Sequence, residues 1–124
     1  MTKLFLVTGS LNAAAAVILG AFGAHGLKER LTTDMLSVYQ TGVQYHFYHA
    51  LGLILIGILA FHLPSSTWLR CSGWLMLTGI ILFSGSLYLL SVTKLRWLGM
   101  ITPLGGLAFI LSWLLLTYAV LKSQ

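Results

Sequence analysis

Charged side chains are scarce in this sequence. Of its 124 residues only nine are charged, seven basic and two acidic, whereas about a quarter of the residues in an average soluble domain are charged. Four stretches contain no Asp, Glu, Lys or Arg: residues 4–24, 41–62, 71–93 and 97–121. Each is long enough for a membrane-spanning helix, which needs about 20 apolar residues. The shortage of charge excludes an ordinary soluble domain and predicts four membrane-spanning helices.

Cysteine and catalytic motifs are equally rare. The one cysteine, Cys71, excludes an internal disulfide and a paired-cysteine metal or redox site. No HExxH, GxSxG, phosphate-binding loop or paired-carboxylate motif is present, so we expect no enzyme and no catalytic residue. The basic residues lie singly or in pairs near the ends of the apolar stretches, a pattern typical of lipid-headgroup anchors. Nucleic-acid binding is therefore not expected.

The predicted fold is all-α: an integral membrane four-helix bundle with up-down-up-down topology and short loops. We expect one transmembrane domain over residues 1–124, with helices near residues 4–25, 34–62, 69–92 and 103–121. When the N-terminal amine is counted with the seven basic residues, the positive groups divide equally between the two ends of such a bundle. The close pairs Lys28/Arg30 and Lys94/Arg96 favour an orientation with both termini outside.

Capping signals suggest where the helices begin and end. The stretch Thr32-Thr33-Asp34 is expected to supply the cap of the second helix and an acidic residue in its first turn. Gly26 is expected to end the first helix in a left-handed conformation. Pro64 should close the second helix. Thr102 is expected to cap the fourth helix just before Pro103, which suits the first helical position. A continuous helix kinked at Pro103 is the alternative.

Small residues recur along the first predicted helix at spacings of three or four, which predicts a close-packing seam. Asn12 flanks this seam and should hydrogen-bond to another helix. Further glycines in the other helices could also allow close approach. The predicted packing residues are Gly9, Asn12, Ala13, Ala16, Gly20, Gly23, Gly42, Gly85, Gly105 and Gly106.

The stretch richest in polar groups is residues 39–49. A histidine inside a bilayer-length apolar run is costly unless it faces protein or water. His46 and His49 are three residues apart, and Tyr45 and His49 four apart, so these side chains share one face of a helix. The connectivity of the four helices brings other polar residues to the same half of the bundle. The candidate polar-core or ligand-binding residues are His25, Tyr45, His46, His49, Ser84, Tyr88 and Thr102.

Four short polar stretches carry a family resemblance: GAFGAHG at residues 20–26, YQTGVQYHFYH at 39–49, FSGSLY at 83–88 and ITPLGG at 101–106. With them the sequence resembles the YgdD-like family of small four-helix membrane proteins, which is related to transmembrane protein 256. The resemblance covers essentially the whole chain. It implies a protein of the bacterial inner membrane and brings no established activity, cofactor or catalytic residue.

Three functions are open on these observations. The first is a non-enzymatic bundle, in contact with membrane lipids, that associates with itself or with a larger membrane complex and uses its histidines and tyrosines as a polar core. The second is small-molecule, lipid or quinone binding, or proton relay, at the face of Tyr45, His46 and His49. The third is a haem or metal site with His25, His46 and His49 as ligands. Because no carboxylate lies near these histidines, we expect neither a metal nor a cofactor.

Overall fold

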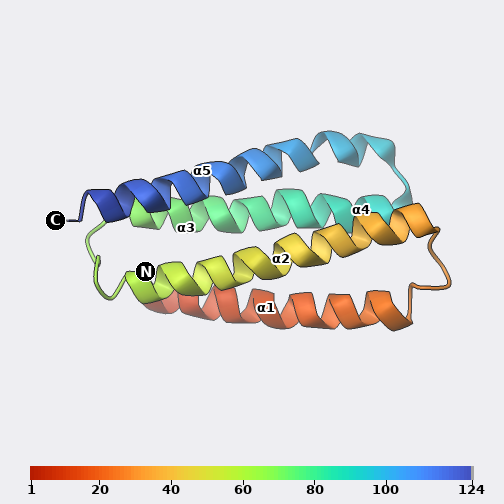
Figure 1. Ribbon diagram of the computed structural model, residues 1–124, viewed down its shortest axis with the longest axis horizontal. Helices are drawn as coiled ribbons and strands as arrows, with labels where there is room; N and C mark the ends of the chain where they lie inside the picture. The colour runs from red at the N-terminus through yellow and green to blue at the C-terminus, as the bar shows by residue number, and fades with distance from the viewer. Residues whose placement is uncertain (124) are drawn as a thin grey trace.

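The structure is a computed structural model that describes residues 1–123, and it forms four helical rods (Figure 1). The first two rods are α1 (Thr2–His25) and α2 (Thr33–Leu59). The third consists of α3 (Thr67–Gly79), the π-helical turn η1 (Ile80–Ser84) and α4 (Gly85–Thr93). A short 3₁₀ helix, η2 (Arg96–Met100), leads into the last rod, α5 (Thr102–Leu121).

The four rods run side by side in alternating directions, so that both ends of the chain lie at the same end of the bundle (Figure 1). All four are long and apolar enough to cross a membrane. Each apolar run forms a helix because only a helix satisfies every backbone polar group within one segment in lipid. The predicted all-α, up-down-up-down bundle is confirmed.

The second and third rods begin at hydroxyl caps. The Thr32 Oγ1 accepts a hydrogen bond from the Met35 backbone N at 3.2 Å, so the cap lies within the predicted stretch Thr32-Thr33-Asp34. The Ser66 Oγ does the same for the Leu69 backbone N at 3.1 Å. The second helix ends at Leu59, three residues before the predicted end. The turn begins at Ala60, so Pro64 lies within the turn rather than closing the helix.

Two capping predictions are wrong. Gly26 keeps a right-handed backbone, with φ −84° and ψ −36°, because the chain continues turning inward and buries Leu27. Thr102 is itself the first residue of α5, and its hydroxyl bonds to Ser86 instead of capping the helix. The residues just before it form the short 3₁₀ helix η2. A left-handed residue does occur, at Lys94 (φ 62°), just after α4.

The π-helical turn η1 is not indicated by any sequence pattern we used. The Gly85 N–H donates to the Ile80 carbonyl, five residues earlier, which widens the helix by one residue. Helix α5 packs directly on this turn, and a Cβ atom on Gly105 would lie 2.3 Å from the Phe83 backbone N. Ser84, the last residue of the turn, donates its hydroxyl to the Gly42 carbonyl of α2 at 2.7 Å.

The predicted small-residue seam lies between α1 and α2. A Cβ on Gly9 would lie 2.9 Å from the Ala50 carbonyl oxygen, and one on Gly20 would lie 3.2 Å from the Val43 side chain. Farther along the seam, Gly23 packs against the ring of Tyr39. Ala16 is buried and Ala13 half-buried on the same side of α1. These small side chains let the two helices approach closely.

The remaining predicted packing glycines differ from one another. A Cβ on Gly42 would lie 3.1 Å from the ring of Tyr88, so this glycine permits a close contact. Gly106 is at ordinary van der Waals distance, with Phe83 ring carbons 3.8 Å from its ideal Cβ. Nothing lies within 4 Å of a Cβ placed on Gly85. The prediction that Gly85 is a packing residue is wrong, because no neighbouring helix approaches it.

The apolar core fills the half of the bundle that holds the termini, with one polar exception. Phe5 is fully buried and lies against Gly73, where a Cβ would be 2.3 Å from its ring. In the same core, Ser72 and Ser112 are buried and each donates its hydroxyl to the other's backbone carbonyl, at 2.7 and 2.6 Å. This reciprocal pair joins α3 to α5 and was not anticipated from the sequence.

Candidate functional site

His46 occupies the middle of α2 and points into the bundle, where 6% of its surface is exposed. Its Nε2 lies 2.9 Å from the Asn12 Oδ1, and its Nδ1 lies 2.8 Å from the Tyr88 hydroxyl. The Asn12 Nδ2 donates to the Thr8 carbonyl, which turns the amide oxygen toward the imidazole. His46 therefore donates from Nε2 and accepts from Tyr88 at Nδ1. One side chain thus connects α1, α2 and α4.

His49, one turn farther along α2, is equally buried. Its Nδ1–H donates to the Tyr45 carbonyl at 2.7 Å, and its Nε2 accepts from the Trp113 Nε1–H at 3.1 Å. The ring stacks on Phe109, with centroids 3.5 Å apart and planes 7° apart. This histidine connects α2 to α5 and carries its proton on the opposite nitrogen from His46.

The arrangement leaves these two histidines without a free lone pair. A neutral imidazole has one nitrogen that donates and one that accepts, and the partners present satisfy both nitrogens of each ring in that form. A metal ion or haem iron would have to displace Tyr88 or Trp113 to reach a ring nitrogen. A second proton on His49 would occupy Nε2, which now accepts from Trp113, and two N–H donors would then face each other. We call His46, His49 and their side-chain partners Asn12, Tyr88 and Trp113 the histidine cluster.

The structure does not bring His25 to the histidine cluster. His25 is exposed at the last residue of α1, and the thirteen residues that separate it from Asn12 span roughly 20 Å of helix. Within residues 1–123 no three histidine, cysteine or acidic side chains are grouped so that they could hold a metal ion. The alternative of a site formed by His25, His46 and His49 is therefore wrong.

Tyr45 takes part in the cluster only through its backbone carbonyl. Its side chain is 37% exposed and lies against Phe83 and Phe109, with ring centroids 4.6 and 6.4 Å away. Residues 45 and 49 share a face as predicted, and their rings are stacked 6.1 Å apart. Among the described residues, however, the Tyr45 hydroxyl has no hydrogen-bond partner, and the side chain is partly exposed on the surface of the bundle.

Ser84 and Thr102 make separate contacts in the same half of the bundle. Ser84 bonds to the Gly42 carbonyl of α2, and the Thr102 hydroxyl shares a 2.6 Å hydrogen bond with that of Ser86. Neither residue touches an imidazole nitrogen. The predicted polar half therefore consists of several independent interhelical hydrogen bonds, of which the histidine cluster is the largest.

Sequence reasoning missed Tyr39 and Trp113. The Tyr39 hydroxyl donates to the Leu19 carbonyl of α1 at 2.5 Å, and its ring lies 5.3 Å from that of Tyr88. The spacing of residues 39, 42, 46 and 49 by three and four would have placed it on the inward face. Trp113 lies deep in an apolar window, where its N–H needs an acceptor, and that need was the available signal.

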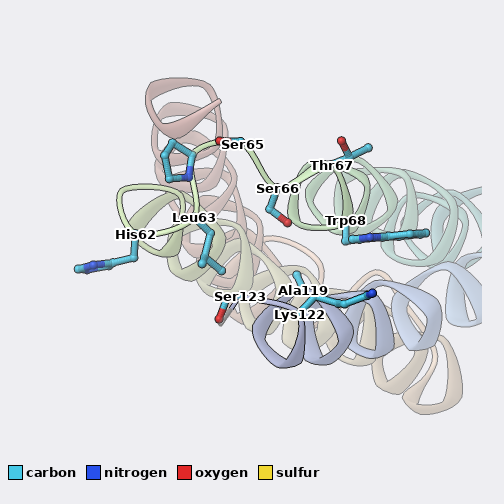
Figure 2. A pocket seen from close by; sticks show the side chains of 10 residues that line it. His62, Leu63, Ser65, Ser66, Thr67, Trp68, Ala119, Lys122 and Ser123 are labelled. Carbon is cyan, nitrogen blue, oxygen red and sulfur yellow. The ribbon is translucent and has the colours of Figure 1, made fainter.

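Cavities that lie outside the histidine cluster include one at the terminal end of the bundle and one between α1 and α2. One, of about 440 Å³, opens at the terminal end between the α2–α3 turn and the end of α5 (Figure 2). Figure 2 shows that His62 points away from it, while the Lys122 side chain extends along one wall. The Lys122 Nζ lies 5.7 Å from the centroid of Tyr118. The other cavity, of about 580 Å³, is an open groove between α1 and α2.

Comparison with known proteins assigns the chain to a family. Residues 19–106 match the family described as "Protein of unknown function (DUF423)". The chain belongs to the DUF423 family. It is 54% identical to the UPF0382 membrane protein YwdK of Bacillus subtilis over 97% of this chain and 98% of that protein. A UPF0382 membrane protein of Staphylococcus epidermidis is 47% identical, over 97% of each chain.

Another UPF0382 membrane protein, from Staphylococcus saprophyticus, is 47% identical to this DUF423 protein over 97% of this chain and 98% of that protein. No solved structure matches the chain. The relatives are named as membrane proteins of unknown function, and the four apolar rods agree with those names. The protein is therefore an integral protein of the bacterial plasma membrane, with a molecular function that is not established for its family.

Proposed function

We propose that this DUF423 protein is a non-enzymatic membrane bundle that serves as a structural or accessory partner of its own copies or of a larger membrane complex. One observation carries the proposal: all four ring nitrogens of His46 and His49 are held in hydrogen bonds within the bundle. Acid–base catalysis and metal binding both need a ring nitrogen that faces a substrate or an ion. A histidine cluster closed in this way instead joins helices.

The histidine cluster suits the role of fixing how the helices pack. Hydrogen bonds between membrane helices contribute on average about 0.6 kcal/mol, and up to about 1.7 kcal/mol. His46 makes one to α1 and one to α4, and His49 makes one to α5. Because an unpartnered polar group in lipid is costly, other alignments of the four rods are disfavoured. Because the chain resembles the YgdD-like family, we propose the same helix-packing role for the members of that family.

The second candidate function is binding of a flat aromatic molecule such as a quinone. The observation that favours it is the exposure of Tyr45 and Trp113, both 37%, beside the ring of His49. A quinone ring could stack on this surface from the lipid side. Proton relay has less support, because the chain Tyr88–His46–Asn12 ends at the backbone carbonyl of Thr8 rather than at a titratable group.

Ligand content after purification in lipid nanodiscs tests the proposal. Wild type, His49→Leu and the control His62→Leu, which changes an exposed histidine in the turn, are compared for haem absorbance, bound metals and extractable quinone. We expect none of these at one per chain in any sample, with only His49→Leu less stable. A stoichiometric ligand in the wild type that His49→Leu loses and His62→Leu keeps would contradict a closed structural core.

A further inference from the structure

The outward face of α2 carries a polar side chain at the depth where the bilayer is most apolar. Gln44 lies two residues before His46, the middle residue of α2, and His46 in turn contacts Asn12 at the middle of α1. At 1.5 Å per residue, Gln44 is about 3 Å from the middle of α2. Its side chain is exposed, and within residues 1–123 its amide makes no hydrogen bond.

An amide in this position needs a partner that lipid cannot supply. Water cannot reach the middle of the hydrocarbon region, and acyl chains offer neither a donor nor an acceptor. A primary amide left without hydrogen bonds in an apolar medium costs on the order of several kcal/mol. A helix carbonyl can accept a second hydrogen bond, as the Thr8 carbonyl does from Asn12, but the Gln44 amide makes no such bond within residues 1–123. A hydrogen-bonding group of another molecule would supply the missing partner.

Gln44 lines the open groove of about 580 Å³ between α1 and α2. The groove exists because α1 presents small or short side chains where α2 presents aromatic ones. Its lining residues on α1 are Ala16, Val17, Gly20 and Ala21, and on α2 they are Val43, Gln44, Phe47 and Tyr48. Close approach of helices in a membrane requires small side chains of this kind.

Helix α1 also has the most surface left to cover. Only 17% of its most apolar 18-residue window is buried in the bundle, against 44% for α2. The seam of α1 that includes Gly9 and Gly23 already packs on α2. The rest of α1 is uncovered, and one edge of that surface, at Val17 and Ala21, borders the groove. A helix entering the groove would cover α1 and Gln44 at the same time.

We propose that the groove is the contact surface for a second copy of this chain, related by a two-fold axis along the membrane normal. Two copies in the same orientation bring their Gln44 side chains to the same depth. An amide has one oxygen that accepts and an NH₂ that donates, so it is complementary to itself. The two Gln44 amides form a reciprocal pair of hydrogen bonds, as an isologous interface requires. The inference rests on the proposed function and names its partner.

Cysteine crosslinking in native membranes tests the surface. In a Cys71→Ser background, Ala21→Cys borders the groove, whereas Ile110→Cys lies on the lipid-exposed side of α5. The neighbour of Ile110, Phe109, stacks on His49, so the control site is close in depth to the histidine cluster. With a short bis-maleimide reagent we expect a dimer from Ala21→Cys and none from Ile110→Cys. Equal crosslinking at both sites, or none at either, would overturn the proposal.

The role of the amide is tested by Gln44→Leu in lipid nanodiscs or liposomes, with the dimer fraction measured as the protein is diluted in lipid. Loss of two interhelical hydrogen bonds should weaken dimerisation about tenfold. Gln40→Leu is the matched control, because Gln40 lies one turn nearer the headgroups, and it should have a smaller effect. Unchanged dimerisation of Gln44→Leu would overturn the amide contact, and so would a lipid found tightly bound in the groove of a monomeric protein.

These outcomes are separable from those of the proposed function. A monomer whose histidine cluster is closed and free of ligand would overturn the dimer and leave the structural role of the cluster intact. A dimer that carries a stoichiometric haem, metal or quinone at His49 would support the groove contact and contradict the non-enzymatic, closed-core role.

Discussion

On the inward face of α2, His46 and His49 have hydrogen-bond partners for all four ring nitrogens, while on the outward face of the same helix Gln44 has none within residues 1–123. The three side chains lie within a stretch of six residues and therefore at similar depth in the bilayer. What differs is the neighbour: α1, α4 and α5 for the histidines, and the open groove for Gln44.

The difference shows how a polar residue in a membrane helix reports on its surroundings. In water an exposed glutamine needs no explanation, because solvent satisfies it. In hydrocarbon each polar group must be satisfied by protein. The inward face of α2 is complete within one chain, and the outward face is incomplete until something docks there. Four predictions test this comparison, from the most damaging change to the mildest.

Among changes inside the bundle, a large side chain at Gly105 should cause the largest loss of stability. A Cβ at this position would lie 2.3 Å from the Phe83 backbone N and 2.7 Å from its Cα, and backbone atoms cannot move aside as a flexible side chain can. Gly105→Leu should lower the free energy of unfolding by about 3 kcal/mol or more. Unfolding by SDS in mixed micelles measures the change.

Gly85→Ala is the matched control, since nothing lies within 4 Å of a Cβ there. It should raise the free energy of unfolding by up to about 1 kcal/mol, because alanine favours a helix more than glycine does. Wild-type stability of Gly105→Leu would mean that α5 does not pack on Phe83 as described.

Removing an inward histidine should have the next largest effect. His46→Leu deletes two hydrogen bonds and leaves Asn12 and Tyr88 without their partner. We expect a loss of about 1–3 kcal/mol in the free energy of unfolding. In a double-mutant cycle with Tyr88→Phe, the coupling energy should be about 0.6–1.7 kcal/mol. Strictly additive effects would show that the two side chains do not interact.

The serine pair should give a smaller loss with a distinctive pattern. Ser72→Ala or Ser112→Ala removes one of two reciprocal hydrogen bonds to a backbone carbonyl, at a cost of about 1 kcal/mol. The double variant should cost less than the two single losses added together, because the hydroxyls also lie 3.2 Å apart and form one unit. A double variant that costs the full sum would indicate two independent bonds.

A substitution on the outward face of α2 should change the stability of the monomer least. Gln44→Leu removes an amide that contacts no polar group of its own bundle, so the free energy of unfolding of the monomer should stay within about 0.5 kcal/mol of wild type or rise slightly. Unfolding at high dilution in micelles, where copies are separated, measures it. A loss as large as that of His46→Leu would show that Gln44 is part of the bundle interior.

Hydropathy and helical spacing were sufficient to predict the four rods, the inward direction of His46 and His49 and the bond from Asn12 to another helix. These features depend on properties of a single segment: its length, its charge and the angle between its residues. A cap within Thr32-Thr33-Asp34 was predictable for the same reason, because a cap bonds to a backbone group two or three residues away.

Features that depend on which helix lies opposite could not be predicted. Spacing placed Tyr45 and His49 on one face but could not show that the Tyr45 hydroxyl lacks a partner among the described residues. Connectivity placed His25 in the same half of the bundle as the histidine cluster. It could not show that His25 lies too far from Asn12 to join the cluster. The π-helical turn, the open space at Gly85 and the Ser72–Ser112 pair all follow from how α5 packs on the third rod.

Solid-state NMR of the protein in lipid, with ¹⁵N-labelled histidine, tests the closed cluster most directly. Proton–nitrogen correlation distinguishes which ring nitrogen carries the hydrogen. The structure predicts two neutral imidazoles of opposite tautomer, His46 protonated at Nε2 and His49 at Nδ1, each fixed by its partners. Two identical tautomers, an imidazolium at either position, or rapid exchange between tautomers would contradict this account.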